Sequence, residues 1–153
     1  MAAIAVRRRD ERISMITMEL SGLDEMRKAL QNASDEVRKK ASEEVYRSAM
    51  RIQSAAVKRI QRGPASGEVY EKYNPRRTHQ ASAPGEPPMS DIGRLASSIE
   101  WNADSILEAS VFSRVEYAPY LEFGTKNMEA RPFLLPSVEE DAPRFREGLR
   151  GIL

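Results

Sequence analysis

Apolar residues recur at steps of three or four along residues 23–62, and this spacing predicts a long amphipathic helix. Ser21 and Asp24 stand three residues apart, as in a capping box at a helix start. Ser34 could cap a second helix, so the pattern fits either one helix of about 40 residues or a short helix followed by a long one. Many apolar positions are alanine, which favours a closely packed neighbour. This neighbour is either the protein's own sheet, the interpretation we favour for most of the stripe, or another subunit.

Alternation of apolar and polar residues predicts a half-buried strand over residues 16–20. Residues 107–113 and 117–123 also have the composition of strands, and a short segment before them ends at Trp101 after a helical turn at 93–97. With turns at 102–104 and 114–116, these segments predict an antiparallel meander of about three strands, to which residues 16–20 could add. Pro119 indicates that the segment 117–123 is an edge strand or is bulged. Gly124 permits a tight turn after it.

A last helix is predicted from about Pro136 to Leu149, because apolar residues there keep helical spacing. The expected fold class is therefore α+β, with a long N-terminal helix packed on a small antiparallel sheet and a C-terminal helix. Residues 13–153 are expected to form a single domain, preceded by a flexible basic arm over residues 1–12. Arg7, Arg8 and Arg9 in this arm are candidates to face a partner protein or DNA.

Residues 63–93 contain five prolines and four glycines, and they predict a long irregular loop. Arg76 and Arg77 lie in this loop with Tyr70 and Tyr73 nearby, so basic and aromatic side chains stand together. This combination suits nucleic acid, through phosphate contacts and stacking. It equally suits a loop that becomes ordered against a partner protein, and we favour the partner protein.

The charge of the chain is small in total but uneven along it. Of the 153 residues, 31% are charged and the net charge is +1. Residues 1–94 contain 18 basic and 13 acidic residues, which gives a net charge of +5. Residues 95–153 contain 6 basic and 10 acidic residues, which gives a net charge of −4. Such a molecule can stack head to tail with copies of itself or turn one face toward an anionic partner, although ordinary scatter would give the same numbers. No apolar run approaches the ~20 residues that cross a bilayer, so we expect a soluble, non-secreted protein.

Few catalytic arrangements can be built from these residues. The sequence has no cysteine and a single histidine, His79, so thiolate chemistry and histidine metal clusters are excluded. Phosphate-binding glycine loops and nucleophile elbows are absent from the sequence. The acidic runs at residues 43–44 and 139–141 fall on predicted helices, where we interpret them as solvated residues or partners of the helix dipole. We therefore expect no catalytic, cofactor or metal site.

Five short motifs occur in an order that resembles a known family. They are residues 22–25 (GLDE), 82–86 (SAPGE), 93–95 with 98–99 (GRL and SI), 117–125 (YAPYLEFGT) and 131–136 (RPFLLP). Together they resemble the neck and tail-completion family of tailed bacteriophages, over about residues 16–150. The resemblance implies an α+β virion protein without enzymatic activity, assembled in the host cytoplasm into the head–tail junction. Family members are thought to form rings, so the implied partners are copies of the chain (six or twelve), adjacent connector, stopper or tail-tube proteins, and genomic DNA in the channel.

The candidate contact residues follow from the last two motifs. An edge strand with aromatic side chains invites pairing with another chain, and Arg131 could pair with Glu122 or cap carbonyl groups. The expected subunit or partner interface comprises Tyr117, Tyr120, Glu122, Phe123, Arg131 and Phe133. An alternative function is a small nucleic-acid-binding regulator that uses the basic N-terminal half. A small hydrolase is the least supported of the three.

Overall fold

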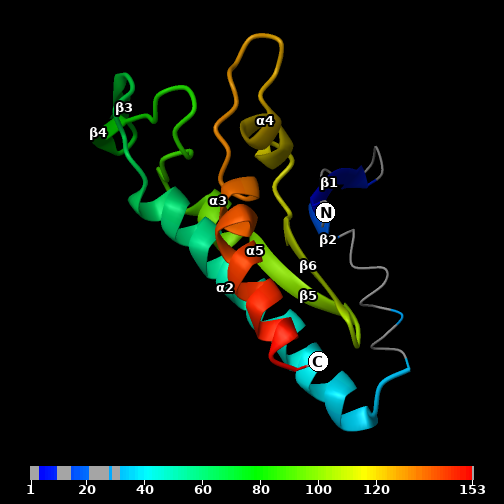
Figure 1. The fold of residues 1–153 in the computed structure, drawn as a ribbon. Helices are drawn as coiled ribbons and strands as arrows, with labels where there is room; N and C mark the ends of the chain where they lie inside the picture. Colours follow the sequence, from blue (N-terminus) through cyan, green and yellow to red (C-terminus); the bar gives the residue numbers. More distant parts are fainter. Residues whose placement is uncertain (1–3, 10–14, 21–27, 29–31, 153) are drawn as a thin grey trace.

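Helix α2 (Asp35–Arg62) is the longest element of the computed structural model, which describes residues 4–9, 15–20, 28 and 32–152 (Figure 1). The hydroxyl of Ser34 caps its first turn by accepting the N–H of Val37 at 3.4 Å, as its sequence position predicts. Of the two predicted arrangements, the structure agrees with a separate long helix that begins after Ser34. The predicted helix start at Ser21 and Asp24 lies outside the described residues.

Helix α5 (Leu135–Arg150) lies along α2 and confirms the predicted C-terminal helix (Figure 1). Its predicted apolar stripe, Val138, Ala142, Phe145 and Leu149, is buried. The larger core cluster joins this helix to α2 and to the sheet; its most buried members are Ala56, Ile60, Ala118, Phe133, Leu134 and Val138. A smaller cluster of Ala41, Phe145 and Leu149 closes the other end of the helix pair.

Strands β5 (Ile99–Ser105) and β6 (Glu108–Ser113) form an antiparallel hairpin against α2. The short helix α3 (Arg94–Ser97) precedes β5, as predicted. Ile99 and Val111 are buried in the core. The predicted turn at residues 102–104 is wrong, because β5 continues through these exposed polar positions and the chain turns only at Ile106.

Two further hairpins depart from the sequence prediction. Strands β1 (Ile4–Arg9) and β2 (Met15–Leu20) pair with each other, where the sequence predicted a flexible arm over residues 1–12 and a strand at 16–20 that could add to the meander. Strands β3 (Val69–Tyr73) and β4 (Arg76–Gln80) pair in the segment predicted as an irregular loop. Strand β2 packs beside β6, and β3–β4 extends from the end of α2 (Figure 1). The predicted α+β class is confirmed, but its sheet consists of separate two-stranded hairpins in the described part of the chain.

Helix α4 (Ala118–Phe123) replaces the predicted edge strand at 117–123. The N–H groups of Tyr120 and Leu121 donate to the carbonyl of Tyr117 at 3.1 and 3.2 Å, which closes the first turn. Pro119 lies in that first turn, where its missing N–H costs no intrahelical bond. The proline that suggested an edge strand is therefore equally compatible with a helix start.

Candidate functional site

The carboxylate of Glu122 links α4 to the start of α5. One of its oxygens accepts the backbone N–H groups of Phe133 and Leu134 at 2.9 and 3.0 Å, and the other accepts that of Leu135 at 2.7 Å. These N–H groups belong to the first residue of α5 and to the two residues before it, and the N-cap residue Leu134 provides no side-chain cap. Glu122 is 4% exposed, so its negative charge is buried against the positive end of the helix dipole.

A tight loop between α4 and α5 completes this connection. The N–H of Arg131 donates to the carbonyl of Leu121 at 2.7 Å, and Thr125 pairs with Met128 as an isolated bridge. Gly124 adopts φ of +73° and ψ of −179°, a region that essentially only glycine occupies. A Cβ atom at this position would also lie 2.8 Å from the backbone N of Ala130. The two motifs at residues 117–125 and 131–136 therefore fold as one unit.

Helix α4 turns an aromatic face outward, on the side opposite Glu122. Tyr117, Tyr120 and Phe123 are 38%, 49% and 44% exposed, and their spacing of three residues aligns them on one side of the helix. We call these three residues the α4 aromatic face. Of the six residues expected at an interface, these three are therefore available to a partner.

The other three expected interface residues lie inside the subunit. Phe133 is fully buried in the core, and Glu122 is occupied by the N–H groups described above. Arg131 is partly buried. Among the described residues, its side chain forms neither the expected ion pair with Glu122 nor the expected hydrogen bond to a carbonyl group. Instead its positive charge contributes to lowering the pKa of Glu86.

Glu86 organises the segment that carries the SAPGE motif. Its carboxylate accepts the hydroxyl and the N–H of Ser66 at 2.5 and 3.2 Å, and the N–H of Ala83 at 2.7 Å. These bonds, the hydroxyl of Ser66 first, hold the pKa of Glu86 below its usual value. The N–H of Gly85 then donates to the carbonyl of Ala130 at 3.0 Å, so this segment packs against the loop between α4 and α5.

Hairpin β3–β4 is attached to the body through Asp91. Lys72 on β3 donates to Asp91, and Nη2 of Arg77 on β4 lies 3.0 Å from the same carboxylate. Nδ1 of His79 lies 3.7 Å from it. The hydrogen bond from Lys72 is the main reason that the pKa of Asp91 is lowered. Arg77 is thus engaged within the subunit, whereas Arg76 is exposed; the side chains of Arg7, Arg8 and Arg9 lie outside the described part of the structure.

The hairpin exposes apolar and aromatic side chains on both of its faces. Val69 and Tyr73 lie on one face of β3 and Tyr70 on the other, and Tyr73 is 76% exposed. We call these three residues the hairpin surface. Figure 1 shows the hairpin at one end of the molecule, beyond the C-terminus of α2, whereas the β5–β6 turn lies near the opposite end.

A polar network joins the middle of α2 to α5. Nε and Nη2 of Arg51 donate to the two carboxylate oxygens of Asp141 at 2.5 and 3.1 Å, and Nη2 also donates to Glu44 at 2.9 Å. Ser48 donates to Asp141 at 2.5 Å. The hydrogen bond to Asp141 is the main cause that raises the pKa of Arg51. The interpretation of Glu44 and Asp141 as solvated residues is wrong, because both are buried here.

One pattern in the sequence indicates that these polar residues of α2 are buried, and the prediction of solvated acidic residues overlooked it. Glu44, Ser48 and Arg51 follow one another at steps of four and three, directly beside the apolar stripe of α2. Polar side chains at such positions are buried if another helix covers them, and α5 does so here. Their partner Asp141 lies 90 residues from Arg51 in the sequence, so spacing alone could not identify it.

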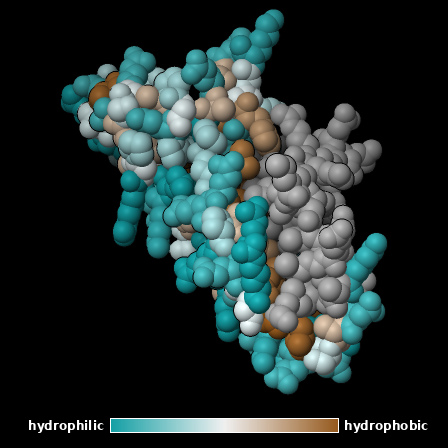
Figure 2. Space-filling view, in the orientation of Figure 1, coloured by the Kyte–Doolittle hydropathy of each residue, from teal (hydrophilic) through white to brown (hydrophobic). Residues whose placement is uncertain are grey.

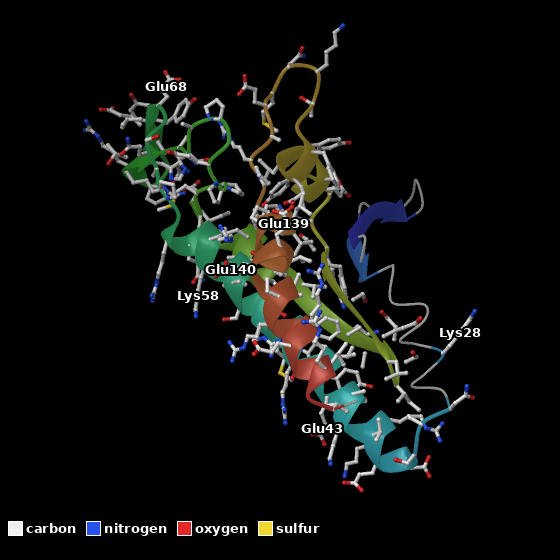
Figure 3. All side chains as sticks on the ribbon, viewed as in Figure 1. Lys28, Glu43, Lys58, Glu68, Glu139 and Glu140 are labelled. Atoms are coloured by element: carbon white, nitrogen blue, oxygen red, sulfur yellow. The ribbon has the colours of Figure 1, made fainter. Side chains whose placement is uncertain are left out.

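An open groove of about 550 Å³ lies beside the network, between α2 and α5. Figure 2 shows that this side of the molecule is largely hydrophilic. The groove is lined by Met50, Arg51, Ser54, Ala55, Lys58, Arg59, Ser137, Glu140, Asp141 and Arg144. Nη2 of Arg59 lies 2.7 Å from Glu140 across it. Lys58 extends outward from α2 (Figure 3).

Two properties of the described residues bear on the kind of site. Histidine, aspartate and glutamate side chains do not gather in groups of three or more that could hold a metal ion in this part of the chain. The described helices are also too short or too polar to cross a membrane.

The fold and its contacts define a small α+β protein whose buried polar groups hold helices and loops together while aromatic residues remain on its surface. The chain matches the model of the family described as "Bacteriophage HK97-gp10, putative tail-component" over residues 24–124, which is about two thirds of its length. It belongs to this HK97-gp10-like family, and it is a tail-associated structural protein of bacteriophages. Neither a curated protein nor a solved structure matches the chain. The resemblance to a phage neck and tail-completion family is confirmed at this level.

Proposed function

We propose that this protein forms a ring in the phage neck, where it joins the DNA-filled head to the tail as a head–tail connector or tail terminator. The observation that carries the proposal is that one subunit exposes two unlike apolar surfaces. These are the α4 aromatic face (Tyr117, Tyr120 and Phe123) and the hairpin surface (Val69, Tyr70 and Tyr73). Two unlike surfaces that fit each other give head-to-tail contacts, and such contacts close into a ring if the rotation between neighbours allows it.

The exposure of hairpin β3–β4 supports a role in assembly. Most of its residues are exposed, including alternate positions on both strands. A two-stranded hairpin with both faces in water is marginally stable, and its free edges can pair with another chain. A neighbouring subunit or an adjacent connector, stopper or tail-tube protein would cover these groups. Arg76, which is exposed on the hairpin, is positioned to contact such a partner.

The α4 aromatic face would form the complementary contact. Tyrosine and phenylalanine bury a large area at little cost in side-chain entropy, and aromatic residues are enriched in the centres of protein interfaces. The rigid attachment of α4 through Glu122 and Gly124 keeps this face in one orientation, which lowers the entropic cost of binding. The proposed ring contains six or twelve copies, with genomic DNA passing through its channel.

The proposal is tested by measuring the mass of the purified protein in solution, with negative-stain imaging, and by its incorporation into phage particles. We expect rings or incorporation for the natural protein, and loss of both for Y120S/F123S, which removes the α4 aromatic face. I106S is the matched control, because Ile106 is 64% exposed at the β5–β6 turn and lies away from both surfaces. A protein that remains monomeric and never enters particles would overturn the proposal, as would equal defects in the two variants.

A further inference from the structure

The groove between α2 and α5 has an excess of positive charge that its own ion pairs do not neutralise. Four cationic and two acidic side chains line it. Asp141 and Glu44 hold Arg51, and Glu140 holds Arg59. The remaining cations, Lys58 on α2 and Arg144 on α5, are exposed and form no ion pair with the described residues.

The uncharged groups of the groove also favour an anionic ligand. Ser54 lies one helical turn before Lys58 and is exposed, with a hydroxyl that can donate to the same ligand. Lysine ammonium, arginine guanidinium and serine hydroxyl groups are the side-chain donors that typically contact phosphate oxygens. Arg51 and Arg59 are neutralised by their carboxylates, so the positive charge offered to a ligand comes from Lys58 and Arg144.

We infer that this groove binds the phosphodiester backbone of double-stranded DNA through Lys58, Arg144 and Ser54. None of the ten lining residues is aromatic, so the groove offers no platform on which unpaired bases could stack. Cations without such a platform instead suit the phosphates of a duplex, which are contacted without regard to sequence. The identity of the DNA as the phage genome rests on the proposed neck position, whereas the binding of a duplex does not.

This assignment changes which cations face the DNA. The sequence suggested Arg76 and Arg77, together with Arg7, Arg8 and Arg9, but Arg77 is engaged by Asp91. In the groove, by contrast, the unpaired cations come from two packed helices, which fix the backbone positions of both residues. Binding there would place the side of the molecule that carries α2 and α5 toward the channel of the proposed ring.

The test compares two double variants that remove the same charge. K58Q/R144Q removes the unpaired groove cations, and K39Q/K126Q removes two exposed lysines that form no ion pair with the described residues and lie outside the groove. The affinity of each protein for a random-sequence DNA duplex is measured by fluorescence anisotropy across a range of salt concentrations. Circular dichroism verifies that both variants are folded.

Each phosphate contact contributes about 0.9 to the slope of log affinity against log salt concentration, so we expect K58Q/R144Q to lower this slope by about 1.8. The control should keep the slope of the natural protein. Absence of duplex binding by the natural protein at low salt would overturn the inference, as would equal slopes in the two variants. Displacement of DNA by polyglutamate at equal charge concentration would also overturn it, because an acidic protein would then be the better ligand.

The same variants separate this inference from the proposed ring. If K58Q/R144Q assembles normally and loses only its DNA affinity, the inference and the ring proposal both stand. If it assembles normally and binds DNA like the control, the DNA inference fails while the ring proposal stands. If Y120S/F123S forms particles as well as the natural protein while K58Q/R144Q loses DNA affinity, the ring contact fails and the groove stands.

Discussion

Replacing Glu122 by alanine should destabilise the protein strongly, although Glu122 lies in a motif that resembles an interaction site. The substitution leaves the N–H groups of Phe133, Leu134 and Leu135 without their acceptor. A buried donor without a partner costs about 1–3 kcal/mol, and bonds to a charged acceptor lie in the upper part of that range. Three such losses are not additive, and water can reach the partly buried Leu135. We therefore expect a loss of about 3–5 kcal/mol in the free energy of unfolding.

The glutamine variant refines this expectation. An amide oxygen can still accept the N–H groups of Phe133 and Leu134, but the amide nitrogen then faces the N–H of Leu135, and two donors oppose each other. The loss should be smaller, about 1.5–3 kcal/mol. Urea unfolding followed by the fluorescence of Trp101, the single tryptophan of the sequence, measures both values. E129A is the control, because Glu129 is an exposed carboxylate in the adjoining loop. If E122A remains within about 0.5 kcal/mol of the natural protein, as surface substitutions do, the capping role is refuted.

Two other predictions concern the loop and the hairpin. Gly124 and Gly85 both have positive φ, but of these two only Gly124 has backbone atoms where a Cβ atom would lie. G124A should therefore lower the free energy of unfolding by about 1–3 kcal/mol more than G85A, as measured by thermal or urea unfolding. Equal costs would show that the loop can move aside. In K72M, the pKa of Asp91 should rise toward its ordinary 3.8, because the hydrogen bond from Lys72 is the main cause that lowers it. Because the pKa of Asp91 is lower in the folded protein, its charged form stabilises the attachment of β3–β4 at pH values above the ordinary pKa. This stabilisation is lost as the pH falls through the pKa of the folded state, so the variant should release the hairpin at a higher pH. Carboxyl NMR titration of Asp91 and amide exchange in β3–β4 measure both effects, and an unchanged titration would contradict this attachment.

The elements that the sequence predicted well are those in which one periodic face is buried. Helices α2 and α5 follow this rule, because their apolar stripes pack against each other and against the β5–β6 hairpin. The cap at Ser34 is a local feature and was equally predictable. Strand β6 (Glu108–Ser113) also matches the segment predicted at residues 107–113 to within one residue.

The failures occur where a short segment depends on a distant partner. Residues 118–123 are too few to show a period, and the helix is fixed by contacts of Glu122 with residues more than ten positions away. The predicted loop at 63–93 contains a hairpin, although Tyr and Thr in five-residue runs on either side of Asn74 and Pro75 are signals for strands and a turn. The density of proline and glycine around these runs concealed that signal.

The candidate site shows the same division between local and distant information. Exposure of Tyr117, Tyr120 and Phe123 follows from helical spacing once α4 is known to be a helix, but a strand would have placed Tyr117 and Tyr120 on opposite faces. The groove cations Lys58 and Arg144 could not be recognised at all from the sequence. Their importance depends on which carboxylates pair with Arg51 and Arg59 and which cations remain unpaired.

The motif at residues 117–125 therefore has two separate roles on two sides of one short helix. Its inward residues, Glu122 and Gly124, allow the chain to enter α5 and belong to the scaffold of the subunit. Its outward residues form the α4 aromatic face, which the scaffold holds in place without using it. A protein can keep the inward residues and alter the outward ones without losing its fold. The motif thus identifies the scaffold of a tail-associated phage protein, whereas we propose that the partners of this protein are chosen by the exposed face, by hairpin β3–β4 and by the groove between α2 and α5.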